Sequence, residues 1–206
     1  WGFNHINSGQ VDLFNSLSIR NKVIIPFSEE VFKQTRPGDW IRWFKADEIY
    51  HSLVDLQPNN PVVLNNASYV ALNLSDYTRA ESLVKRSLAI VDNQPDSLDT
   101  LGWIYYHTKE YNEALVWTQK LDSVNKLTNA SEYIIKSNQL KLDIYLKNGE
   151  YKKAEKAGLN GLVVARKDKQ ILDEIIILKR LAKVAKANNQ NSLAAKYLFE
   201  LLELED

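Results

Sequence analysis

The fold is decided by residues 95–118, which read PDSLDTLGWIYYHTKEYNEALVWT. In the first half, apolar side chains recur at the i, i+3, i+7 spacing of one helical face, at Leu98, Leu101 and Tyr105. A polar turn follows, and a second apolar run then begins. Gly102 in the first run and Ala114 in the second are small enough for two helices to cross closely. The stretch therefore predicts two helices packed side by side.

The same arrangement recurs along the chain. Alanines preceding bulky residues stand 34 residues apart at 46, 80 and 114, and further alanines follow 40 residues apart at 154 and 194. A turn signal precedes each of the last four, and Asn148-Gly149 suits a left-handed turn that ends a helix. The spacing predicts helices at about 39–56, 60–73, 77–92, 95–108, 111–124, 129–147, 151–166, 169–187 and 191–205.

A 34-residue period with this content resembles the tetratricopeptide repeat. The matching positions from Pro95 are Leu98, Leu101, Gly102, Tyr105, Tyr111 and Ala114. Those from Pro61 are Leu64, Ala67, Ser68, Ala71, Tyr77 and Ala80. The resemblance implies an all-α fold, a right-handed superhelical array of antiparallel helix pairs with about four or five repeats. It is strongest at 61–128 and covers roughly residues 40–206.

Two parts of the chain differ in pattern. Residues 1–38 lack the repeat, and we expect an irregular N-terminal segment with a short helix that caps the array. Residues 39–206 are expected to form the helical repeat domain. The helix at 169–187 is apolar on most of its circumference, which is typical of a helix that another element covers. We expect another element to cover the leucine-rich end of the chain as well.

Composition argues against several classes of function. Lys and Arg total 26 and so do Asp and Glu, so the basic excess of a nucleic-acid binder is missing. Without cysteine the chain can form neither disulfides nor thiolate metal sites. Its apolar runs are shorter than the ~20 residues that span a bilayer, so we expect no direct membrane insertion by this segment.

Catalytic patterns are weak. The histidines are His5, His51 and His107, and Glu48 with His51 has the spacing of a di-iron ligand pair whose second pair is missing. Phosphate loops, zinc motifs and nucleophile elbows do not occur. We therefore predict no enzyme activity, catalytic residue, metal or cofactor. The remaining enzyme hypothesis, a site in residues 1–40 that uses His5, has too little chain to build on.

In the family that the chain resembles, the first helix of each pair lines a concave groove. Carried over position by position, the resemblance implies a groove of amide, acidic and aromatic side chains that suits an extended peptide. The candidate groove residues are Asn65, Asn66, Tyr69, Asn73, Asp99, Trp103, Tyr106, His107, Lys136 and Asp143. A subtype that clamps carboxylate tails is disfavoured, because only Lys136 matches its pattern.

The predicted function is that of a non-catalytic scaffold or adaptor, which binds a protein or an extended peptide in this groove. The sequence at 61–66 and 95–104 resembles that of bacterial envelope repeat proteins of polysaccharide export and pilus assembly. A periplasmic or envelope location is therefore favoured over the cytoplasm. The alternative is a structural or oligomerisation module of a larger enzyme or membrane protein. Homodimerisation through the C-terminal helices is a further prediction.

Overall fold

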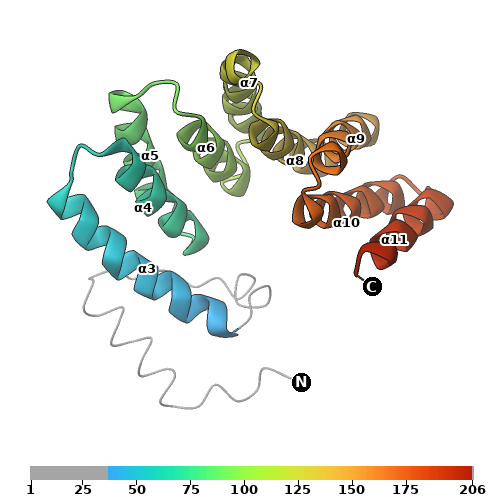
Figure 1. The fold of residues 1–206 in the computed structure, drawn as a ribbon, viewed down its shortest axis with the longest axis horizontal. Helices are drawn as coiled ribbons and strands as arrows, with labels where there is room; N and C mark the ends of the chain where they lie inside the picture. The colour runs from blue at the N-terminus through green and yellow to red at the C-terminus, as the bar shows by residue number, and fades with distance from the viewer. Residues whose placement is uncertain (1–36, 206) are drawn as a thin grey trace. The chain divides into compact units, whose positions relative to one another are not determined.

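The computed structural model describes residues 37–205, and every regular element in that range is a helix (Figure 1). The helices are α3 (Pro37–Leu56), α4 (Pro61–Asn73), α5 (Tyr77–Ile90), α6 (Pro95–His107), α7 (Tyr111–Thr128), α8 (Ser131–Lys147), α9 (Tyr151–Lys167), α10 (Ile171–Ala187) and α11 (Asn191–Glu205). The chain divides into two compact units, Trp1–Leu83 and Val84–Asp206. The prediction of an all-α solenoid of helix pairs is confirmed.

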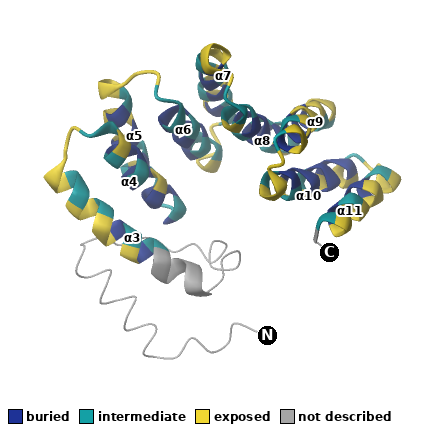
Figure 2. Ribbon diagram, in the orientation of Figure 1, coloured by how far each residue is buried: buried dark blue, intermediate teal, exposed yellow. Residues whose placement is uncertain are grey.

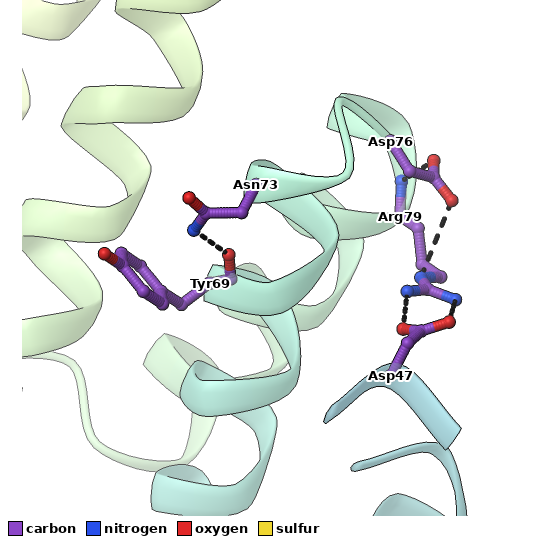
Figure 3. A network of polar contacts seen from close by, with 5 residues as sticks. All are labelled: Asp47, Tyr69, Asn73, Asp76 and Arg79. Atoms are coloured by element: carbon purple, nitrogen blue, oxygen red, sulfur yellow. Dashed lines mark hydrogen bonds and ion pairs between the residues drawn. The ribbon is translucent and has the colours of Figure 1, made fainter. Parts of the chain in front are cut away.

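In the first unit, α4 packs against α3 and against the start of α5. Ser68 and Ala80 are fully buried, and the Ser68 hydroxyl donates a hydrogen bond of 2.7 Å to the Ala80 carbonyl. Only a small side chain at position 80 lets the helices approach this closely. Figure 3 shows Arg79 of α5 reaching Asp47 of α3 through both carboxylate oxygens, one at 3.2 Å from Nη1. This paired contact joins α3 to α5.

In the second unit, the pairs α6/α7, α8/α9 and α10/α11 stack in chain order. Ala114 and Ala154 are fully buried at the crossings, as the sequence predicts. A Cβ added to Gly102 would lie 2.8 Å from Cδ2 of Leu140, so α6 and α8 approach each other closely there. Figure 2 shows buried residues concentrated where helices face one another. The crossings therefore depend on small residues, and leucines fill the space between them.

Five of the turns between consecutive helices share one geometry. The second residue after the helix has a left-handed backbone at Ser75, Lys109, Gly149, Lys169 and Asn189, with φ of 62°, 67°, 73°, 55° and 58°. At Lys109 the amide donates to Tyr106 and the next amide, of Glu110, donates to Tyr105. These two hydrogen bonds form the Schellman motif, whose left-handed residue is usually glycine. The chain supplies a glycine at only one of the five turns, so the others hold a side chain in a strained conformation.

The predicted helix boundaries hold within two residues except at α7. That helix continues to Thr128 rather than ending at 124, because Leu121 stays fully buried and Asn125 caps the end. The Asn125 amide donates to the carbonyl of Ala130, and its oxygen accepts from the Ala130 amide. Such local capping by a polar side chain is hidden in a polar stretch of sequence.

The helix α3 begins at Pro37, two residues before the predicted start, since proline is compatible with the first turn of a helix. The predicted capping segment at 1–38 lies outside the described residues apart from its last two positions, as does His5. Across residues 37–205, none of the helices has the length and apolar character needed to cross a membrane.

Candidate protein-binding face

In the second unit the first helices of successive pairs lie against one another, α6 against α8 and α8 against α10. The second helices α7 and α9 do not approach each other to the same extent. The first helices therefore form the inner face of this unit. We call this surface the α6–α8–α10 face; its side chains are Asp96, Asp99, Trp103, Tyr106, His107, Tyr133, Lys136, Gln139, Asp143, Asp173 and Arg180.

Aromatic rings cover the α6 part of the face. Trp103 and Tyr106 meet edge to face with centroids 5.5 Å apart, and the His107 ring lies 6.2 Å and 5.3 Å from them. Tyr106 also contacts Tyr111 of α7 at 5.8 Å. Trp103 and Tyr106 are half-buried, so each ring keeps an accessible part while its neighbours fix its orientation.

Ion pairs connect α6 to α8. Nζ of Lys136 lies 3.3 Å from Asp96 and 2.7 Å from Glu132, and the Tyr133 hydroxyl lies 3.3 Å from Asp96. Burial lowers the pKa of Lys136, but the hydrogen bond to Glu132 and the nearby carboxylates outweigh it and raise the pKa on balance. Lys136 thus stays charged and holds the two helices in register.

Arg180 of α10 organises the other end of the face. Its guanidinium lies 5.6 Å from the centroid of the Trp103 ring, 3.2 Å from a carboxylate oxygen of Asp143 and 3.0 Å from the Gln139 side-chain oxygen. The Gln139 amide donates in turn to Asp173 at 2.8 Å. A planar cation that pairs with a carboxylate and stacks on an aromatic ring holds all three helices in place.

Asp99 is the least satisfied group on the face. Its Oδ1 is buried and accepts no hydrogen bond. Burial raises the pKa of Asp99 to about 7, and the charge of Lys136 and a hydrogen bond from Trp103 offset only part of that effect. Because its pKa is about 7, the Asp99 carboxyl group is partly protonated at neutral pH.

Burial also shifts the pKa values of Tyr106, Asp143 and His107. Burial, with the charge of Asp143, raises the pKa of Tyr106 to about 12. It raises the pKa of Asp143 as well, against the opposing charge of Arg180. It lowers the pKa of His107, whose ring packs on its aromatic neighbours although the residue as a whole stays largely exposed. Tyr106 and His107 are therefore neutral at pH 7, and they offer hydrogen bonds rather than charge.

The remaining predicted residues lie on α4 in the first unit. Tyr69 is 49% exposed and meets Trp43 of α3 edge to face at 5.8 Å. Figure 3 shows the Asn73 amide donating to the Tyr69 carbonyl, at 2.7 Å. Asn66 is half-buried, whereas Asn65 is buried and its Oδ1 has no hydrogen-bond partner. As on α6, a ring with an accessible part lies on the same helix as a buried acceptor that lacks a donor.

The structure brings six predicted residues onto the α6–α8–α10 face, namely Asp99, Trp103, Tyr106, His107, Lys136 and Asp143. The sequence prediction did not extend the groove register to Arg180, whose equivalents one and two periods earlier are Leu140 and Thr100, both buried in the structure. The long side chain of an arginine can start in the core and carry its charge to the surface. Tyr133 and Asp173, which stand 40 residues apart in the sequence, were also not predicted. Within residues 37–205, acidic and histidine side chains form no cluster that could hold a metal.

No known family model matches the chain, and no curated protein matches it. Solved structures do. MamA from Desulfovibrio magneticus RS-1 (residues 41 to the end) has a TM-score of 0.59 and 16% identity, over 98% of this chain and 97% of that one. The TPR-like repeats of a putative kinesin light chain of Podosopora anserina have a TM-score of 0.62 and 16% identity, over 79% and 86%.

PilW, described as a widely conserved type IV pilus biogenesis factor, has a TM-score of 0.55 and 15% identity, over 85% of this chain and 93% of that one. At these identities the likeness concerns the path of the backbone and not the groove side chains. Together with the paired helices and buried alanines, it confirms that the chain has the tetratricopeptide-like fold that the sequence predicts.

Proposed function

We propose that the chain is a non-catalytic scaffold that binds a partner protein, through an extended segment laid along the α6–α8–α10 face. The observation that carries the proposal is Asp99, whose buried Oδ1 lacks a hydrogen bond beside the half-buried ring of Trp103. A buried acceptor without a hydrogen-bond donor lowers the stability of the fold. Such a group is therefore expected mainly where it serves a function. A backbone amide or a basic side chain of the partner would satisfy this acceptor once the neighbouring side chains move aside to admit the donor.

The rest of the face suits the same role. Trp103 and Tyr106 are already held in place by packing, so they lose little side-chain entropy when a partner covers them. The pairs formed by Lys136 and Arg180 fix the spacing of the three helices. A face of ordered donors, acceptors and rings is preorganised for binding.

Affinity capture tests the proposal, with Trp103→Ala as the variant and Trp117→Ala as its matched control. Trp117 is also half-buried and lies under Lys120, but it belongs to α7, a second helix. Wild type and Trp117→Ala should retain the same protein from an extract of the producing cells. Trp103→Ala should bind it at least about 30-fold more weakly, as expected for loss of an aromatic hot spot of about 2 kcal/mol.

Helical circular dichroism must be unchanged in both variants for this comparison to count. Equal capture by all three proteins would refute the assignment of the α6–α8–α10 face. Capture lost equally in the two variants would refute it as well, since the second helices would then matter as much as the first.

The finer role that we propose is assembly of a bacterial envelope structure. Its support is the sequence similarity of residues 61–66 and 95–104 to bacterial envelope repeat proteins, together with the backbone likeness to PilW. Fractionation of the producing cells tests it. We expect the chain in the periplasmic or envelope fraction, and recovery in the cytoplasm alone would contradict this role.

Self-association is the second candidate function, favoured by the apolar side chains that α11 leaves exposed. Leu198, Phe199 and Leu202 are 49%, 63% and 60% exposed. Light scattering tests this role through the molar mass: we expect a concentration-dependent rise from the 23.7 kDa of one chain towards twice that value. A constant mass of one chain would contradict it.

A further inference from the structure

We infer that the chain forms a homodimer in which the α11 helices of two copies pack antiparallel, about a two-fold axis that passes between Leu198 and Phe199. This inference rests on the self-association proposed above and assigns its surface and its register. Several residues of the described part of α11 are exposed, and the helix carries yellow segments in Figure 2. Among them is an apolar stripe at the i, i+3, i+4, i+7 spacing of a helix-packing face, made of Ala195, Leu198, Phe199 and Leu202.

Comparison with α9 shows what normally covers this position. The helices α9 and α11 begin 40 residues apart, so Leu202 is equivalent to Leu162 and Leu198 to Gly158. Leu162 is only 3% exposed, and a Cβ at Gly158 would touch Leu181 of the following first helix, α10, and Leu142 of α8. On α11 the same positions are left open. The occupant that fits is therefore another helix.

The polar residues beside the stripe favour a second α11 as that helix. Lys196 and Glu203 are both exposed and stand seven residues apart, on the same side of the helix. In an antiparallel pair centred on the stripe, Ala195 lies opposite Leu202 of the other copy. Lys196 then lies within about 3 Å, along the helix axis, of Glu203 of the other copy, at 1.5 Å per residue. The two-fold axis makes this contact twice. The apolar stripe of one copy therefore meets that of the other, and each Lys196 meets a Glu203.

The expected dimer is weak. Specific interfaces bury roughly 1,200–2,000 Å² in total, and a contact of one helix from each copy is small on that scale. The monomer and dimer should therefore exchange at micromolar concentrations, where sedimentation velocity resolves both.

Charge reversal tests the register on the full 206-residue chain. Lys196→Glu and Glu203→Lys should each weaken the dimer by about tenfold or more, because each creates two like-charge contacts. The double variant, K196E with E203K, should restore it, because the swapped charges meet again across the axis. Lys126→Glu, an exposed lysine on α7, is the control and should leave the dimer unchanged.

A second measurement does not depend on charge. The chain has no cysteine, so Phe199→Cys introduces a single thiol next to the axis, and mild oxidation should link two copies. Leu127→Cys on α7, at a position 89% exposed, should not link them. A monomer at every concentration would overturn both the inference and self-association. A dimer that the double variant does not restore, or that Phe199→Cys does not link, would overturn the inference while leaving self-association and the α6–α8–α10 face intact.

Discussion

Replacing Gly158 by alanine should destabilise the chain, although alanine is the better helix former. The added Cβ would lie 2.5 Å from Cδ2 and 2.9 Å from Cγ of Leu181, and 2.7 Å from Cδ1 of Leu142. Both leucines are buried, so neither can rotate into solvent. Overpacking of this kind costs about 1–3 kcal/mol. Alanine recovers about 1 kcal/mol of helix propensity, which leaves a net loss of up to about 2 kcal/mol.

Gly161→Ala in the same helix is the matched control. Its Cβ would lie 3.2 Å from the terminal carbon of Ile177 and 3.3 Å from Cβ of Asn138, contacts that small shifts relieve. The propensity gain is the same, so the difference between the two variants isolates the close crossing. Urea unfolding followed by circular dichroism at 222 nm measures it. If Gly158→Ala were as stable as Gly161→Ala, the close crossing of α9 with its neighbours would be refuted.

Three further changes have expected outcomes in the same unfolding assay. Lys109→Gly should stabilise the chain by about 1 kcal/mol, because it relieves a left-handed residue. Burial raises the pKa of Asp99 from 3.8 to about 7, so its stabilising contribution is complete below pH 4 and is lost as the pH rises through 7. Asp99→Asn should therefore exceed wild type in stability at pH 8, by at most about 4 kcal/mol, and not at pH 4. Arg166→Ala should cost about 1–2 kcal/mol, because it removes 2.7 Å ion pairs to Glu174 and Glu200 and leaves the buried Glu174 unpaired.

Each of these predictions has its own control. Lys169→Gly, at another left-handed turn, should stabilise like the first variant, whereas Lys167→Ala, at an exposed helical position, should be neutral. Asp168→Asn should show no comparable gain at pH 8. A destabilised Lys109→Gly would contradict the Schellman geometry. An Asp99→Asn variant whose gain in stability is the same at pH 4 and pH 8 would contradict the protonation argument. An Arg166→Ala variant as stable as wild type would contradict a stabilising role for the ion pairs that join α9 to α10 and α11.

The helix pairs could be predicted because the sequence signal is local and repeated. Ala80, Ala114 and Ala154 mark crossings, and the apolar stripe around Leu101 marks the buried face. The end of α7 could not be predicted, since its cap depends on the Asn125 side chain bonding across the turn. Capping by a polar residue in a polar stretch leaves no periodic trace.

The candidate face could be predicted only where side-chain direction follows helix register. Trp103 and Lys136 lie on it for that reason. Arg180 occupies a register that is buried in the preceding pairs, and its length alone brings its charge to the face. The missing donor at Asp99 depends on packing between helices, which a single sequence does not encode in any local pattern.

Hydrogen exchange of the chain, alone and with its captured partner, tests the proposed function most directly. Backbone amides of α6, α8 and α10 should gain protection when the partner binds, whereas those of α7 and α9 should exchange as before. Protection centred on α7 and α9 instead would contradict the account.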